Sequence, residues 1–158
     1  MTPIAQTDTP LHLLAGFARF YPDSAPERVL RVPGLALWAV VLPRKDLHFH
    51  VASADIGLRT SFSYQTAKQR CTLLHRPLPN WARYTAGMLR YLRETGLDFP
   101  GFDVVLAGDE GDGARYEYAL GQGFGMVCYT LAGVECSEAK LMDAAEHVHR
   151  DYLRVYAR

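Results

Sequence analysis

The sequence predicts an α+β fold, in which a mixed β-sheet is packed by helices on one side. Short alternating or apolar runs, typical of strands, fill the first part of the chain. Longer segments with apolar residues at helical spacing fill the second part, and one strand pattern, at residues 102–106, separates two of them. This order differs from the regular alternation of a doubly wound fold, and it favours a sheet with helices gathered on one face.

Composition restricts the possible partners and the compartment. The chain has 158 residues, enough for one domain, and its formal net charge of +0 gives no electrostatic reason to expect a nucleic-acid partner. Cys71, Cys128 and Cys136 are too scattered for a disulfide framework, which favours reduced thiols in a cytoplasmic protein. Neither a signal peptide nor a membrane-spanning run is recognisable, so we expect no membrane partner. Residues 1–10 are expected to form a flexible tail, and residues 11–158 a single domain.

The first half of the domain is expected to supply one helix and four strands. The helix is predicted at residues 11–21, and the strands at 28–32, 35–42, 47–52 and 59–64. The run at 35–42 is almost entirely apolar, which predicts a central strand. In the next strand His48 and His50 share one face, because side chains alternate along a strand. Residues 65–79 read as a loop.

The second half is expected to supply three helices and the strand at 102–106. In the first helix Asn80 is a candidate N-cap and Gly96 a candidate C-terminal stop. Trp81, Tyr84 and Met88 recur at helical spacing, which predicts core anchors and not ligand contacts. The second helix, residues 114–132, is apolar in so many directions that we expect it to be buried nearly all round. The third is expected to begin after a Ser137 cap and to reach the C-terminus.

The stretch "AGDEGDGARYEYALGQGFG", residues 107–125, looks like a phosphate-binding loop that runs into a helix. A strand leads into it, glycines follow, and a helical run leads out, as in loops whose backbone N–H groups cradle phosphate. The charges, however, are those of a loop that repels phosphate. Asp109, Glu110, Asp112 and Glu117 lie in the loop and the first helical turn.

The segment "NWARYTAGMLRYLRETGLDFPGFDVVLAGDEGDGARYEYALGQGFGMVCYTLAG", residues 80–133, resembles the middle of the N-terminal domain of galactokinases, members of the GHMP kinase superfamily. The shared order is a tryptophan-led helix, an apolar strand ending in A-G-D, a phosphate loop and a long helix. Upstream, "RVPG" (31–34) resembles the A-P-G of that family, and "HFHVASAD" (48–55) its strand ending in S-A-D. Downstream, "AAEHVHRDYLRVYA" (144–157) resembles a later helix. The resemblance implies the fold of the N-terminal domain of GHMP kinases.

The departures from the family pattern imply that no catalytic residue is present. Family members follow A-P-G with a sugar-binding motif, whereas Gly34 here passes directly into Leu35 and a strand. The family's catalytic aspartate lies beyond the segment that matches the end of this chain, as does its C-terminal domain. The sequence therefore predicts a truncated, degenerate galactokinase-like protein.

The phosphate loop itself survives only as a remnant. In the family, glycine N–H groups hold the phosphates, and serine hydroxyls hold phosphate and magnesium. The matching positions here are Gly111, Gly113, Ala114, Arg115 and Glu117. Tyr116, Glu117, Tyr118 and Ala119 stand where the family has leucine and serines, and the Tyr116 ring and Glu117 are expected to fill the space of a triphosphate. We therefore expect no intact nucleotide site and no cofactor.

Other residues suggest weaker sites. His48 and His50 have a spacing seen in metal sites, but no third ligand is identifiable, and two solvent-facing histidines are the simpler interpretation. Cys71 lies near His75 in the sequence, inside the expected loop, which leaves thiol chemistry open. Asp143, His147 and Asp151 are four residues apart on a helix, as in surface ion pairs.

These observations lead to one main function hypothesis and two alternatives. The main one is a catalytically inactive binding or self-associating module. The first alternative is a residual sugar kinase that uses ATP and Mg, or one half of a split kinase that another protein chain completes. The second is a small metal-binding protein that uses His48 and His50. We expect a homodimer, because helix 114–132 needs cover on all sides and zero net charge does not oppose association. The competing expectation is a monomer whose N-terminal helix folds over the exposed face.

Overall fold

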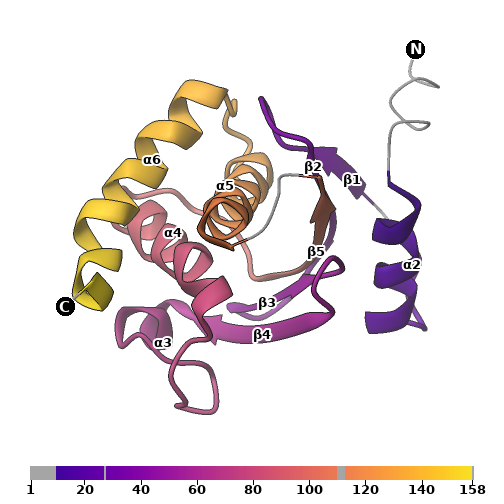
Figure 1. The fold of residues 1–158 in the computed structure, drawn as a ribbon, viewed down its shortest axis with the longest axis horizontal. Helices are drawn as coiled ribbons and strands as arrows, with labels where there is room; N and C mark the ends of the chain where they lie inside the picture. Colours follow the sequence, from indigo (N-terminus) through magenta and orange to yellow (C-terminus); the bar gives the residue numbers. More distant parts are fainter. Residues whose placement is uncertain (1–9, 27, 110–112, 158) are drawn as a thin grey trace.

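The computed structural model describes residues 10–26, 28–109 and 113–157. Its centre is a five-stranded sheet in the order β1-β2-β5-β3-β4 (Figure 1). The strands are β1 (Arg28–Arg31), β2 (Leu37–Pro43), β3 (His48–Ser53), β4 (Leu58–Ser63) and β5 (Phe102–Gly108). Strands β3 and β5 are parallel and the other neighbouring pairs are antiparallel, so the sheet is mixed, as predicted.

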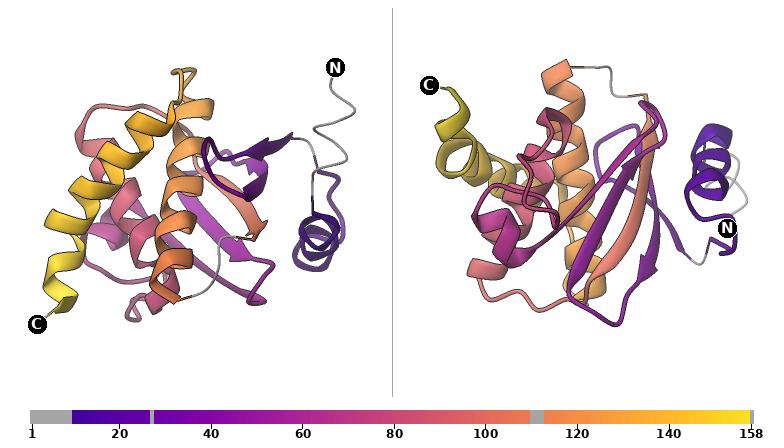
Figure 2. Two further views of the ribbon diagram at one scale, coloured as in Figure 1. Left: turned by 45° about the horizontal axis from the view of Figure 1, so that its top comes forward. Right: turned by 90° about the horizontal axis from the view of Figure 1, so that it is seen from below.

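The helices are α2 (Leu11–Phe20), α3 (Tyr64–Lys68), α4 (Arg83–Glu94), α5 (Gly113–Leu131) and α6 (Glu138–Asp151), with short 3-10 turns η1 (Asn80–Ala82) and η2 (Leu153–Ala157). Helices α4, α5 and α6 lie on one side of the sheet, with α5 against the strands and α6 packed on α4 and α5 (Figure 2). The predicted α+β class is therefore confirmed. The expected tail falls mostly on residues 1–9, which lie outside the described residues.

The main core joins the helix layer to the sheet through aromatic rings. Phe124 of α5 lies 5.0 Å from Phe102 of β5 and 5.9 Å from Phe62 of β4, measured between ring centroids. Phe49 of β3 packs edge-on against Phe102 at 5.1 Å. These four side chains are fully buried, and edge-to-face pairs stabilise a core beyond the area that they bury.

Helix α2 departs from the expectation that all helices share one face. Leu13 and Phe17 of α2 pack on the opposite face of the sheet, against Trp38, Val40 and Val105 (Figure 1). The cause is visible in β2, which is apolar on both sides and therefore needs cover on both faces. The short N-terminal helix provides that cover for one part of the second face.

Helix α5 can approach its neighbours closely because of three glycines. A Cβ added at Gly121 would lie 2.7 Å from the Tyr84 Cβ of α4, and one at Gly123 would lie 2.8 Å from a methyl carbon of Leu106 in β5. At Gly125 it would lie 3.2 Å from Met88. The glycine-rich run that suggested a nucleotide site therefore continues as a packing surface, buried from residue 119 to residue 128.

Three local predictions were wrong and two were confirmed. Asn80 does not cap α4, because it is the first residue of η1, and α4 begins at Arg83. The expected loop at 65–79 contains most of α3, which forms because Ser63 and Thr66 make a reciprocal capping box. The last helix ends at Asp151, and η2 follows it. The Ser137 side chain does accept a hydrogen bond from the Lys140 N–H, and Gly96 does follow α4 with φ +92°.

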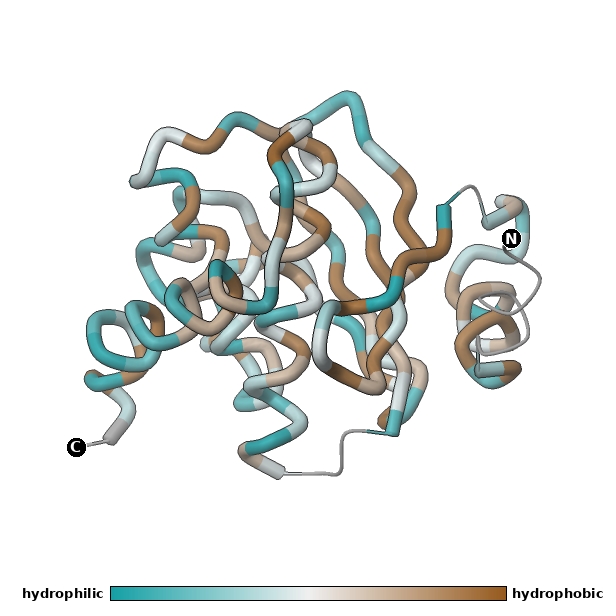
Figure 3. Tube along the Cα trace, turned by 90° about the horizontal axis from the view of Figure 1, so that it is seen from above, coloured by the Kyte–Doolittle hydropathy of each residue, from teal (hydrophilic) through white to brown (hydrophobic). Residues whose placement is uncertain are grey.

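Figure 3 shows hydrophobic residues along the strands and on α2, with hydrophilic residues on the outer loops and on much of α6. No helix among the described residues is long and apolar enough to cross a membrane. Of the three predicted anchors, Trp81 and Met88 are buried. Tyr84 is partly buried and lies edge-on to Tyr118, with 5.4 Å between ring centroids.

We expect Met88→Ala to lower the free energy of unfolding by about 2 to 5 kcal/mol, because it removes a fully buried side chain and leaves a cavity. Denaturant unfolding measures the effect. Met142→Ala is the matched control, because that methionine is 51% exposed, and it should change stability by less than about 0.5 kcal/mol. Equal effects of the two variants would contradict the assigned face of α4.

Candidate functional site

The stretch that resembles a phosphate loop lies where β5 leaves the sheet and α5 begins. Residues 110–112, which include the predicted remnant residue Gly111, lie outside the described residues. On the near side, Gly108 is needed for packing, since an added Cβ would lie 2.0 Å from the Ala36 carbonyl oxygen. On the far side, Gly113 has φ +65°, and it is exposed together with Ala114 and Arg115.

Tyr116 is the first buried residue of α5, and its ring lies inside the protein. Its hydroxyl donates to Oδ2 of Asp55 at 2.6 Å and lies 2.5 Å from Oγ of Ser53. Because the tyrosine proton goes to Asp55, the Ser53 hydroxyl donates to the tyrosine oxygen. The structure thus joins "SAD" (53–55) to the first turns of α5, and the buried Tyr116 ring serves as an internal link between them.

Asp55 extends this network to two further elements. Its Oδ2 accepts the backbone N–H of Gly108 at 3.0 Å, and its Oδ1 accepts Nε2 of His12 on α2 at 2.6 Å. The network therefore ties together the end of β3, the end of β5, the start of α5 and the outer helix α2. Burial raises the pKa of Tyr116 well above its usual value, and the Asp55 hydrogen bond raises it further. The phenol stays neutral and holds its proton at physiological pH.

The described part of the loop offers little to a phosphate. Between Gly113 and Ala119 the sequence has no serine or threonine hydroxyl. Asp109 is exposed, and its backbone N–H is occupied by the Ala36 carbonyl at 2.8 Å. Glu117 is partly buried. Burial raises its pKa, and the charge of Arg83 lowers it. Carboxylates at a helix start interact with the same partial positive charge that would attract phosphate.

His48 and His50 share one strand face, as predicted, but no metal ligand set forms around them. His50 lies beside Asp103 in the register of β3 and β5, and burial lowers the pKa of His50. The exposed His48 donates its backbone N–H to Asp46 at 3.0 Å. Within the described ranges, no group of three or more His, Cys, Asp or Glu side chains is placed to hold a metal ion.

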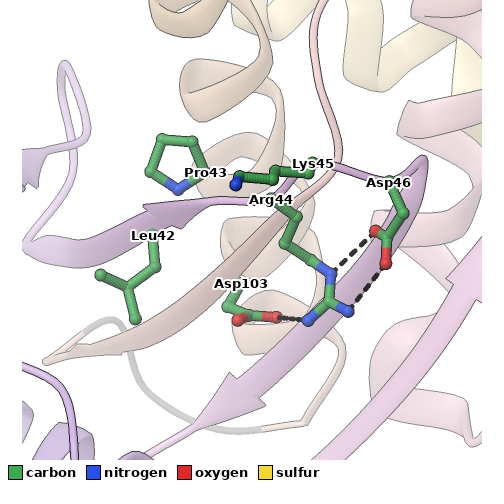
Figure 4. A pocket seen from close by; sticks show the side chains of 6 residues that line it. All are labelled: Leu42, Pro43, Arg44, Lys45, Asp46 and Asp103. Atoms are coloured by element: carbon green, nitrogen blue, oxygen red, sulfur yellow. Dashed lines mark hydrogen bonds and ion pairs between the residues drawn. The ribbon is translucent and has the colours of Figure 1, made fainter.

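A charged cluster that was not predicted from the sequence lies on this face of the sheet (Figure 4). Nε and Nη2 of Arg44 donate to the two carboxylate oxygens of Asp46 at 2.9 Å, and Nη1 donates to Asp103 at 3.0 Å. These residues, with Leu42, Pro43 and Lys45, line an open depression of about 620 Å³ at the end of β2. The turn Arg44-Lys45-Asp46 was the only sequence signal. Because the arginine uses three of its nitrogens within the cluster, we interpret it as a structural tie.

Three other pairs that the sequence singled out come together. Sγ of Cys71 lies 3.9 Å from Nδ1 of His75, at the limit of a sulfur hydrogen bond. On α6, His147 lies 3.9 Å from Asp143 and 4.0 Å from Asp151, as expected for surface pairs. Such exposed pairs contribute little to stability.

We expect Tyr116→Phe to lower the free energy of unfolding by about 1 to 3 kcal/mol, because Asp55 and Ser53 lose a buried partner. Urea denaturation measures it. Tyr129→Phe is the control, because that residue lies on the same helix and its hydroxyl makes no hydrogen bond to any other described residue. If the Tyr116 variant were as stable as the control, the network would not be a structural tie.

Stability should also fall at alkaline pH. The unfolded chain loses the tyrosine proton near its usual pKa of about 10, whereas the folded pKa of Tyr116 is higher. The contribution of Tyr116 to stability is therefore complete below about pH 10 and is lost as the pH rises above that value. Tyr21, whose pKa burial raises to about 12, acts with the same sign. The free energy of unfolding, measured from pH 8 upward, should decline less steeply with pH in Tyr116→Phe than in the unaltered chain. An identical slope would contradict the raised pKa of Tyr116.

No protein-family model and no curated protein matches the sequence. Solved structures do match. The galactokinase of Lactococcus lactis, crystallised with galactose, aligns with a TM-score of 0.66 and 15% sequence identity over 89% of this chain and 42% of that chain. The mevalonate kinase of Methanococcus jannaschii aligns with a TM-score of 0.54 and 8% identity, and another mevalonate kinase with 0.52 and 9%, each over 72% of this chain and 36% of the kinase.

The chain thus spans less than half the length of each of these kinases. The predicted resemblance is confirmed at the level of architecture, as a match to one part of a larger kinase. At identities of 8 to 15% the likeness concerns the fold alone. This chain has a GHMP-kinase-like fold, shared with galactokinase and mevalonate kinase.

Proposed function

We propose that this chain is a non-catalytic domain with a GHMP-kinase-like fold, and that it acts as a binding or self-associating module. The observation that carries the proposal is the start of α5. There the hydroxyl of Tyr116 is hydrogen-bonded to Ser53 and Asp55 inside the protein. The neighbouring positions, from Gly113 to Ala119, offer no serine or threonine hydroxyl that could hold a phosphate or a magnesium ion.

Electrostatics supports the same conclusion. A helix start attracts phosphate when its N–H groups are free and the surrounding charge is positive. Asp109, Glu110, Asp112 and Glu117 surround this one in the sequence, against the single cation Arg115. Repulsion between such charges is screened only beyond about 8 Å at physiological salt. Four acids so close to one helix start should therefore weaken the binding of any nucleotide.

A residual or split sugar kinase remains the second candidate, and one observation favours it. The chain matches 36% to 42% of the length of the kinases that share its fold, so another chain could supply the remaining residues. Such an enzyme would still need ATP and Mg at the start of α5. Nucleotide binding therefore separates the two candidates. The metal-binding alternative gains no support from the described residues around His48 and His50.

We expect no useful ATP binding. Calorimetry with Mg-ATP should give a dissociation constant weaker than about 100 μM, which corresponds to about −5.5 kcal/mol. Arg115→Ala is the matched variant, because Arg115 is the one cation of the remnant sequence. Binding tighter than about 100 μM that is lost in this variant would contradict the proposal and favour the split kinase.

Galactose phosphorylation by the purified chain should be undetectable, because the family's sugar motif has no counterpart after Gly34. A coupled assay of ADP release tests this expectation. Turnover that persists through purification and is abolished by a substitution in this chain would overturn the non-catalytic assignment.

Self-association is proposed on a different surface from the one that the sequence suggested. Helix α5 is buried nearly all round, as predicted, but its cover comes from the sheet, α4 and α6 of the same chain. Helix α2 covers part of the other sheet face and leaves a stripe of its own exposed. Leu11 is 83% exposed and Leu14 is 38% exposed, and Ala15 and Ala18 continue the stripe.

We expect a homodimer that buries this stripe, since an apolar helix face is seldom left in water and zero net charge does not oppose pairing. Light scattering at micromolar concentration should give about twice the monomer mass of 17.7 kDa. Leu11→Glu combined with Leu14→Glu should give the monomer. Leu74→Glu, at a residue that is 78% exposed in a loop, is the control and should leave the dimer intact. A monomer mass for the unaltered chain at every concentration would refute the dimer.

The cytoplasmic location is also a proposal. It rests on the three cysteines, all of which are free in the structure.

A further inference from the structure

Three buried side-chain atoms of the described residues have no hydrogen-bond partner: Nε of Arg70, Nε of Arg83 and the hydroxyl of Tyr156. Almost all buried polar groups in native proteins are hydrogen-bonded, and an exception calls for an explanation such as an absent water or ion. The three atoms come from separate parts of the chain. Arg70 follows α3, Arg83 begins α4, and Tyr156 belongs to η2.

These residues nevertheless form one cluster. The guanidinium carbon of Arg83 lies 3.8 Å from the centroid of the Tyr156 ring. The guanidinium carbon of Arg70 lies 4.6 Å from the ring of Tyr152, whose centroid is 6.4 Å from that of Tyr156. Burial raises the pKa of Tyr156, and the charges of Arg83 and Arg70 both lower it, so both cations act on the same phenol.

The positive charge of this cluster is not neutralised within the described part of the chain. Arg70 donates from Nη2 to the Tyr152 carbonyl at 3.1 Å, and neither arginine has a carboxylate within 4.0 Å there. Glu117 influences Arg83 only through longer-range charge. By contrast, Arg90 on the same helix as Arg83 is paired with Glu94 at 3.2 Å. Two partly buried guanidinium groups without an acid favour an anion beside them.

We propose that Arg70, Arg83 and Tyr156 form a binding site for a small oxyanion, a phosphate or carboxylate group, separate from the phosphate-loop remnant. The partnerless atoms can all donate a hydrogen bond, and an oxyanion can accept all three. A guanidinium group presents its Nε–H and Nη–H donors as a planar fork that matches two oxygens of such an anion. A single water accepts only two hydrogen bonds and carries no charge, so it would leave the cluster incomplete.

The test is a titration of the intact chain with sodium phosphate and, separately, with sodium acetate, at constant ionic strength set by sodium chloride. Calorimetry and the thermal midpoint report binding, because a ligand of the folded state raises the midpoint as it saturates the site. We expect saturation by at least one anion below about 10 mM, which corresponds to a dissociation constant in the millimolar range or tighter. Phosphate alone, acetate alone or both identify the class of ligand, and each of these results supports the site.

Three variants locate the binding. Arg83→Lys keeps the charge but loses the fork, and it should weaken binding by about tenfold. Arg90→Lys is the matched control on α4 and should leave the affinity within about twofold, because its arginine is already paired. Tyr156→Phe removes the partnerless hydroxyl. It should weaken anion binding while leaving the stability of the anion-free chain unchanged or higher, because no hydrogen bond is lost.

The proposal is overturned if neither anion has a saturable effect, or if Arg83→Lys and Arg90→Lys bind equally well. It is also overturned if Tyr156→Phe destabilises the anion-free chain and leaves anion binding unchanged, because the hydroxyl then has only a structural partner. Variants at Arg83 and Arg115 also distinguish binding at this site from binding at the start of α5. An Mg-ATP signal that is lost in Arg83→Lys but retained in Arg115→Ala belongs to the oxyanion site and leaves the non-catalytic proposal intact.

Discussion

The burial of α5 between the sheet and two other helices determines where the other elements can pack. A helix in that position can reach its neighbours only where its side chains are small, and Gly121, Gly123 and Gly125 provide this contact with α4, β5 and Met88. Phe124, on the same helix, then reaches the aromatic rings of three strands. The position of α5 in turn fixes Tyr116, and through Tyr116 the ends of β3 and β5.

This constraint explains why a glycine-rich sequence here does not require a nucleotide. The glycines at 121, 123 and 125 are inside α5 and serve packing, whereas those of a phosphate loop precede the helix and expose N–H groups. The first residues of α5 differ from these buried glycines, because Gly113, Ala114 and Arg115 are exposed to solvent. Residues at the helix start can therefore change without disturbing the core.

The periodicity of apolar residues predicted most of the fold, because the strands and long helices are buried either on one face or on all sides. The apolar run of β2 and the many apolar directions of α5 were both visible in the sequence. What periodicity could not predict are contacts between distant residues. His12 meets Asp55 and Arg44 meets Asp103 only after folding, and the side of the sheet that α2 covers depends on Trp38 and Val105 together. The Asn80 cap failed for a local reason, because the extended Pro79 is followed by a 3-10 turn.

Two neighbouring parts of the helix layer differ in charge in a way that bears on ligand choice. The loop before α5 is rich in carboxylates in the sequence, and Glu117 adds one at the first helical turns. The cluster of Arg70, Arg83 and Tyr156 has two cations without an acidic partner among the described residues. Since Glu117 also acts on Arg83, the acid side and the basic side are neighbours across the start of α4. Because charge of opposite sign steers an approaching ligand, an anion that comes near this end of the protein should be directed away from the acidic loop before α5 and towards the arginines.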